Sequence, residues 1–165
     1  MIQENVVKVA MADLNVLALT TGVLKTTGLG SCVGLTLYDP AAKVAGMAHV
    51  MLPSSEIARG EQKNIAKYSD TAIPELIRRM VDLGASAIRL EAKLAGGAQM
   101  FAFAANNITM RIGPRNVDSC KEILKRLSIP IKAEDTGGNY GRTIEFHCST
   151  GRMVIHSVHQ AVREI

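Results

Sequence analysis

The chain has 165 residues, of which 47% are hydrophobic and 21% charged, and this composition predicts a single globular domain spanning residues 1–165. No apolar run approaches the roughly 20 residues of a membrane-spanning helix, and residues 1–13 lack a signal-peptide pattern, so we expect a cytoplasmic protein without direct membrane insertion. A net charge of +4 without any block of like charges argues against nucleic-acid binding and suits an acidic protein partner.

The first half of the chain predicts a hairpin preceded by a short strand at residues 6–10. Val33–Tyr38 is apolar and β-branched, and Asp39-Pro40 after it is a turn signal. Val44–Leu52 is a second apolar run, which Pro53 ends. These runs predict a hairpin over residues 32–52, followed by an irregular surface loop over Ser54–Lys67.

Helical periodicity follows that loop. Apolar residues recur at spacings of three and four up to Gly84, at Ile73, Leu76, Ile77, Met80 and Leu83. If Thr71 caps this helix, Pro74 falls in its first turn, where proline is tolerated. A second helix is predicted after Pro114, with one apolar face formed by Val117, Cys120, Leu124 and Leu127.

The remaining segments predict strands. Residues 87–94 alternate between apolar and polar side chains, residues 129–133 form a short apolar segment, and residues 143–148 and 153–158 flank a Ser-Thr-Gly turn as a hairpin. The sum is a mixed α/β fold that is rich in strands and has two helices.

The most unusual segment is Thr26-Thr27-Gly28-Leu29-Gly30-Ser31-Cys32. The glycines permit a tight turn that presents the Cys32 thiol and aims backbone N–H groups, such as those of Gly30 and Ser31, at one point. Such N–H groups would stabilise the oxyanion that forms when a thiolate attacks an amide.

A catalytic thiol needs a base, and His49 is the candidate. It lies on the partner strand of the predicted hairpin, where it would face Cys32, and Thr26 or Thr27 could orient its ring. The alternative is structural, because a lone cysteine before an apolar strand is more often a core residue.

Other chemistries fit the sequence less well. The glycines of residues 28–34 do not form a dinucleotide fingerprint, because a strand follows them where a helix is required. The spacing of His147, Cys148, His156 and His159 matches no standard zinc pattern. We therefore expect neither a cofactor nor a metal ion. The three cysteines, which also include Cys120, form no CxxC pair and are predicted to be free thiols.

Several sequence blocks in one order resemble the chemoreceptor glutamine deamidase family, CheD. They cover most of the chain and comprise Thr26-x-Gly28-Leu29-Gly30-Ser31-Cys32, Asp39-Pro40, Ala48-His49-Val50-Met51-Leu52-Pro53, Lys67-Tyr68-x-Asp70-Thr71-Ala72, Ala92-Lys93-x-Ala95-Gly96-Gly97-Ala98-x-Met100-Phe101, Ile112-Gly113-x-Arg115-Asn116 and Ala133-Glu134-Asp135-Thr136-Gly137-Gly138-Asn139. The resemblance implies a layered α/β/β/α sandwich similar to that of deamidating toxins. It also implies a catalytic triad of Cys32, His49 and Thr26, with Thr26 selected over Thr27 by its spacing from the cysteine.

The same resemblance implies a function and partners. The substrate would be glutamine side chains of methyl-accepting chemotaxis receptors, converted to glutamate through a cysteine thioester, and the same chemistry would cleave glutamate methyl esters. The alternative is a non-catalytic module that binds and stimulates a CheC-type chemotaxis phosphatase. Phe101 is a candidate contact for that partner, although an ordinary place in the core explains it equally well.

Overall fold

The computed structural model describes residues 5–57, 64–100 and 111–165, and its ten strands form two five-stranded sheets. One sheet has the order β1-β3-β8-β9-β10 and the other the order β2-β5-β4-β6-β7. The strands are β1 (Asn5–Lys8), β2 (Leu14–Leu17), β3 (Gly22–Leu29), β4 (Val33–Asp39), β5 (Val44–Val50), β6 (Glu91–Gly96), β7 (Ile131–Thr136), β8 (Arg142–His147), β9 (Arg152–His156) and β10 (Arg163–Glu164). The helices are α1 (Ser69–Asp82) and α2 (Ile112–Arg126), with short 3-10 turns at Ser55–Ile57, Ile65–Lys67 and Ala87–Arg89.

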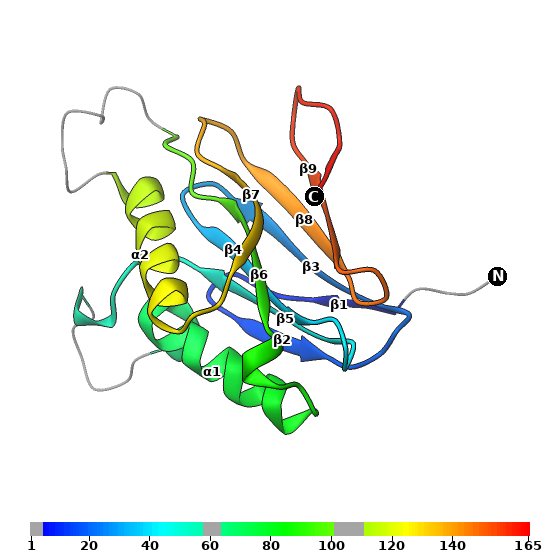
Figure 1. Ribbon diagram of the computed structural model, residues 1–165. Helices are drawn as coiled ribbons and strands as arrows, with labels where there is room; N and C mark the ends of the chain where they lie inside the picture. Colours follow the sequence, from blue (N-terminus) through cyan, green and yellow to red (C-terminus); the bar gives the residue numbers. More distant parts are fainter. Residues whose placement is uncertain (1–4, 58–63, 101–110) are drawn as a thin grey trace.

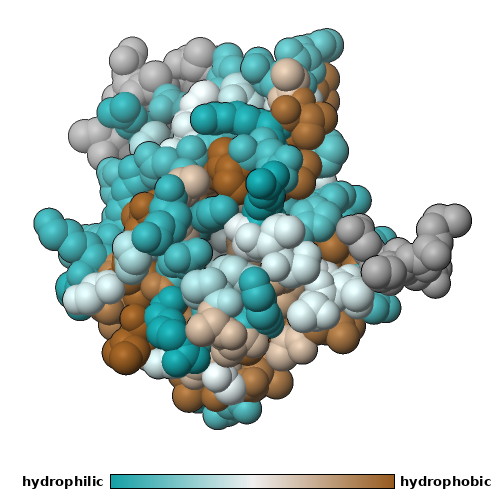
Figure 2. Space-filling model, turned by 45° about the vertical axis from the view of Figure 1, so that its right-hand side comes forward, coloured by the Kyte–Doolittle hydropathy of each residue, from teal (hydrophilic) through white to brown (hydrophobic). Residues whose placement is uncertain are grey.

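The two sheets pack face to face, and both helices lie against the sheet that contains β4 and β5 (Figure 1). The expected mixed, strand-rich α/β class is therefore confirmed. The layer order of the described residues is α/β/β, whereas the family resemblance implied α/β/β/α. The side of the molecule that carries β8 and β9 comes forward in Figure 2, where hydrophilic residues separate small groups of apolar ones. This mosaic is what a solvated sheet face requires.

The hairpin predicted over residues 32–52 is confirmed as β4 and β5, which pair antiparallel from Val33 with Val50 to Asp39 with Val44. Every residue of both strands is buried. One face of these strands packs on the helices, and the other packs on the second sheet. This double covering explains their continuous apolar character.

The connection between the two sheets was only partly predicted. The segment that we expected to be a glycine turn begins inside β3, whose pairing with β8 shifts between Thr26 and Leu29. Gly28 lies in this bulge with φ of +73°, a backbone conformation that favours glycine. The chain then crosses from β3 to β4 through Gly30, Ser31 and Cys32. The bulge and the crossing together place the candidate thiol at one end of the sandwich.

The first helix begins earlier than predicted. Its N-cap is Tyr68, so Pro74 lies in the second turn, and the prediction that Thr71 caps the helix is wrong. The Thr71 hydroxyl instead donates to the carbonyl oxygens of Ile65 and Tyr68. Proline is tolerated there because it removes only one intrahelical bond near the start of the helix.

The second helix has its predicted buried face at Val117, Cys120 and Leu124. Leu127 does not share that face, because it follows the last helical residue and is 45% exposed. Neither described helix is long and apolar enough to cross a bilayer.

Three further boundaries differ from prediction. The strand expected over residues 87–94 is a 3-10 turn followed by β6, and the strand expected over 129–133 is β7, which starts two residues later. The expected surface loop over Ser54–Lys67 contains two 3-10 turns, and its residues 58–63 lie outside the described residues. The C-terminal hairpin is confirmed as β8 and β9.

Candidate active site

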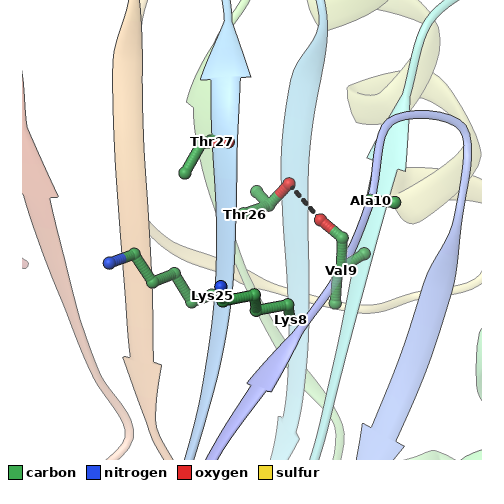
Figure 3. A pocket seen from close by; sticks show the side chains of 6 residues that line it. All are labelled: Lys8, Val9, Ala10, Lys25, Thr26 and Thr27. Atoms are coloured by element: carbon green, nitrogen blue, oxygen red, sulfur yellow. Dashed lines mark hydrogen bonds between the residues drawn. The ribbon is translucent and has the colours of Figure 1, made fainter.

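Thr26 and His49 come from different sheets and meet in the interior of the sandwich. Thr26 is 1% exposed and His49 is fully buried. The Thr26 Oγ1 lies 2.7 Å from His49 Nδ1 and 2.7 Å from the carbonyl oxygen of Val9. Figure 3 shows the Thr26 side chain directed toward Val9. Of the two threonines left open by the residues alone, Thr26 contacts the imidazole, whereas Thr27 is exposed.

These two contacts fix the tautomer of His49. A hydroxyl has one proton, and the Val9 carbonyl oxygen can only accept, so Thr26 donates to Val9. The Thr26 oxygen must then accept from His49 Nδ1–H. In the neutral ring the lone pair is therefore on Nε2. The Val9 carbonyl was not anticipated from the sequence, because no side-chain pattern reports such a backbone acceptor.

The remaining nitrogen of His49, Nε2, is buried and makes no hydrogen bond within the described residues. Burial also lowers the pKa of His49 below its ordinary value of 6.5, which keeps the ring neutral near neutral pH. The backbone of His49 is held by Ala12 N–H at 3.1 Å and Asp13 C=O at 2.9 Å, so the segment between β1 and β2 fixes the strand that carries His49.

Cys32 lies diagonally across β4 and β5 from His49. Gly34 is the register partner of His49, and Cys32, two residues earlier, belongs to the apolar cluster between the sheets that also contains Met47. His49 lies two residues after Met47 on β5 and therefore shares that face. Such diagonal residues have Cα atoms about 7–8 Å apart, within reach of longer side chains. Gly34 supplies no side chain between them, and Ile144 and Leu29 pack over it. The hairpin thus places Cys32 and His49 on the same face of the sheet, diagonal to one another.

The thiol and the imidazole are both held in their neutral forms. Burial raises the pKa of the Cys32 thiol above its ordinary value, and the Cys32 N–H lowers it only in part. The pKa of His49 moves in the opposite direction. These shifts disfavour a resting thiolate–imidazolium pair, so the thiol would lose its proton only when it attacks.

The turn before Cys32 presents two backbone donors. Gly30 N–H donates to Gly28 C=O at 3.1 Å, so it is already occupied. Ser31 N–H has no acceptor among the described residues, and Cys32 N–H faces its own sulfur. The carbonyl oxygens of Gly30 and Cys32 accept from Ala98 and Gly97 at 2.9 and 2.8 Å. In a trans peptide the N–H points away from the C=O of the same peptide, so Ser31 N–H, which shares a peptide with Gly30 C=O, faces away from Ala98.

A cavity of about 310 Å³ borders Thr26 (Figure 3). Two of its side chains, Lys8 and Lys25, are register partners on the parallel strands β1 and β3. Lys25 pairs with Glu145 at 3.4 Å, whereas Lys8 is exposed. The lining residues are Lys8, Val9, Ala10, Lys25, Thr26 and Thr27. Its two lysines, of which Lys25 also pairs with Glu145, give the lining of the cavity beside Thr26 a positive charge.

The remaining candidates lie elsewhere. Phe101 is outside the described residues. Cys120 is buried under α2, and Cys148 bonds to backbone carbonyls of Leu17 and Lys43, so neither thiol approaches His49. No group of three or more histidine, cysteine or acidic residues that could hold a metal occurs within the described ranges.

Comparisons with known proteins identify the family. The family profile described as CheD chemotactic sensory transduction matches residues 51–157, a segment that starts after Thr26, Cys32 and His49. The chain is 55% identical to the chemoreceptor glutamine deamidase CheD of Halalkalibacterium halodurans over 98% of this chain and 99% of the relative. It is 54% identical to a probable chemoreceptor glutamine deamidase of Lachnoclostridium phytofermentans, covering 96% of this chain and 98% of that protein. It is 46% identical to the CheD of Bacillus subtilis, covering 97% and 96%. The chain belongs to the CheD family.

Proposed function

We propose that this protein is a cysteine amidohydrolase that converts glutamine side chains of chemotaxis receptors to glutamate. The observation that carries the proposal is the buried Thr26–His49 hydrogen bond, which leaves Nε2 without a partner among the residues that the structure describes, on the strand next to the Cys32 segment. The names of its relatives, chemoreceptor glutamine deamidases, support the same substrate. Acting on the receptors' cytoplasmic domains would place the protein in the cytoplasm.

The first half of the proposed reaction forms a thioester. His49 Nε2 takes the proton of Cys32 while the sulfur attacks the carboxamide carbon. The negative charge that develops on the amide oxygen is stabilised by the N–H groups of Ser31 and Cys32. His49 then returns its proton to the amide nitrogen, the C–N bond breaks, and ammonia leaves.

The second half consumes one water molecule. His49 takes a proton from the water, whose oxygen attacks the thioester carbon. The C–S bond breaks, the sulfur recovers the proton, and glutamate is released. The product carries a new negative charge at physiological pH. A glutamate methyl ester presents the same carbonyl carbon and would release methanol by the same steps.

Thr26 has a positioning role in this mechanism. Because its hydroxyl donates to Val9 and accepts from Nδ1–H, it holds the ring in the tautomer that leaves Nε2 free. Unlike an aspartate, it adds no charge, so it does not stabilise an imidazolium electrostatically. That difference agrees with a neutral resting pair.

The test is mass spectrometry of a purified chemoreceptor cytoplasmic domain incubated with the protein. Each glutamine converted to glutamate adds about 1 Da, and the wild-type protein should produce this gain at discrete peptides. Cys32→Ala should produce none. Cys120→Ala, which removes another buried thiol, is the matched control and should retain activity. Equal gain with Cys32→Ala would eliminate the proposed nucleophile.

A further inference from the structure

Asn116 is a fully buried side chain of α2 that the mechanism above does not use. Its Nδ2 donates to Ser31 C=O at 3.0 Å and to Met51 C=O at 2.9 Å. Ser31 immediately precedes the nucleophile, and Met51 lies two residues after the base. One amide group from a distant helix therefore joins the two segments that carry Cys32 and His49.

The orientation of this amide is fixed by its partners. Both partners are carbonyl oxygens, which only accept, so the NH₂ group must face them. The Oδ1 atom is consequently directed elsewhere and has no partner among the described residues, although it is buried. A buried acceptor without a donor lowers the stability of the folded state. The fold thus tolerates one unpaired acceptor, while the two N–H donors of the same amide reach the Cys32 turn and the end of β5.

The two carbonyls lie where the hairpin opens. The ladder between β4 and β5 ends at Val33 and Val50. Beyond it, Met51 N–H and Leu52 N–H both donate to Lys67 C=O, so this strand turns away from the Cys32 segment. The Asn116 amide spans the gap between the diverging chains.

Ser31 C=O belongs to the peptide whose N–H is that of Cys32. Because the two groups of a trans peptide point in opposite directions, a bond that holds the carbonyl also holds the N–H on the far side. We propose that Asn116 is a positioning residue that fixes the Ser31–Cys32 peptide, so that Cys32 N–H faces the oxyanion. This inference rests on the proposed function of Cys32. The carbonyl groups of Gly30 and Cys32 accept hydrogen bonds from backbone N–H groups, whereas the Ser31 carbonyl between them accepts from the Asn116 side chain.

The approach of α2 to the turn depends on glycines. A Cβ atom at Gly113, in the first turn of α2, would overlap the carbonyls of Gly97 and Ala98, and one at Gly96 would overlap the carbonyl of Cys32. The 96–98 segment therefore lies in close contact with both α2 and the turn. This packing gives Asn116 a rigid base from which to hold the peptide.

The test compares Asn116→Ala and Asn116→Asp with Ser119→Ala. Aspartate keeps the shape of asparagine but removes the NH₂ donor. Ser119 lies one turn later on α2 and donates to Pro53 C=O at 2.7 Å, away from the catalytic turn. Removing an oxyanion donor costs about 100-fold or more in kcat, so we expect a loss of that order for both Asn116 variants, with KM within about threefold. Ser119→Ala should retain wild-type kcat.

Alkylation of Cys32 by iodoacetamide separates this role from a general loss of structure. That reaction displaces iodide at a saturated carbon and forms no oxyanion, so its rate in the Asn116 variants should stay within about threefold of wild type. A parallel loss of alkylation and deamidation would overturn the proposal, as would an unchanged kcat in both variants. If neither of these variants folds, Asn116→Ser, which introduces no charge and has a shorter side chain, provides the comparison. Deamidation by Cys32→Ala at the wild-type rate would refute Cys32 as the nucleophile, independently of Asn116.

Discussion

The two ends of β4 differ in whether the buried polar groups near them have hydrogen-bond partners. At its last residue, fully buried Asp39 accepts hydrogen bonds from Ala41, Ala42 and Ser86 N–H groups and from the Arg89 guanidinium. At its start, near Cys32, both His49 Nε2 and Asn116 Oδ1 are buried and have no hydrogen-bond partner within the described parts of the chain. A saturated cluster contributes stability, whereas an unsaturated one retains the capacity to react. The strand therefore connects a structural end to a reactive end.

The largest effect should come from removing the nucleophile or the base at the reactive end. Cys32→Ala and His49→Ala should each reduce deamidation by about 10⁴-fold or more, because triad members act as a unit. The double variant should be no slower than either single variant. Rates are measured by mass spectrometry on a receptor domain. Additive losses in the double variant would contradict a shared role.

The structural end should respond in stability and leave the chemistry intact. Asp39→Asn removes the carboxylate charge that pairs with Arg89, and it turns an amide NH₂ toward N–H donors. We therefore expect a loss of about 3 kcal/mol in the free energy of unfolding. Glu75→Gln is the matched control, because Glu75 pairs with Arg78 and Arg79 on the surface of α1, where such pairs contribute about 1 kcal/mol or less. Urea unfolding measures both. At temperatures where it is folded, Asp39→Asn should retain wild-type kcat.

The pH dependence of that stability has a defined sign. Burial alone raises the pKa of Asp39, but the Arg89 guanidinium and the N–H groups of Ser86, Ala42 and Ala41 lower it well below its ordinary value of 3.8. Its contribution is therefore fully present above that ordinary value and is lost as the pH falls below it. The difference in stability between wild type and Asp39→Asn should shrink on acidification. A constant difference would assign the effect to packing.

Removing the Thr26 hydroxyl, which orients His49, should have a smaller effect on activity than removing Cys32 or His49. Thr26→Val removes the bond to His49 Nδ1 while keeping the shape, and we expect kcat to fall about 10- to 100-fold as the ring loses its fixed tautomer. Thr26→Ser should keep most of the activity. Thr36→Val is the control, since Thr36 is equally buried on β4 and donates to Lys93 C=O. Equal losses in Thr26→Val and Thr36→Val would reduce the Thr26 effect to one of packing.

The sequence predicted the local part of this architecture better than the distant part. The β4–β5 hairpin, which places His49 on the strand next to the Cys32 segment, follows from two apolar runs and the turn between them. The Thr26–His49 contact does not, because it joins two sheets, and their stacking depends on packing between segments that no periodicity links. The family resemblance selected Thr26 where residue spacing left Thr27 open. Asn116 lies 85 positions from Ser31, and its bond was visible only in the folded chain.

The smallest expected change is that of kcat/KM with pH, and its measurement distinguishes a neutral Cys32–His49 pair from a thiolate–imidazolium pair. Activity requires neutral His49, whose pKa lies below 6.5, and protonated Cys32, whose pKa lies above 9.0. We therefore expect kcat/KM to vary less than about threefold between those two values, with an acidic limb below the first and an alkaline limb above the second. Alkylation of Cys32 should increase with pH across this plateau, because thiolate accumulates only near its upper end. A resting thiolate–imidazolium pair would instead give alkylation that is already maximal near pH 6.5. That result would show that Cys32 and His49 are already ionised before the thiolate attacks the substrate. Thr26 would then orient an imidazolium and would not select a neutral tautomer.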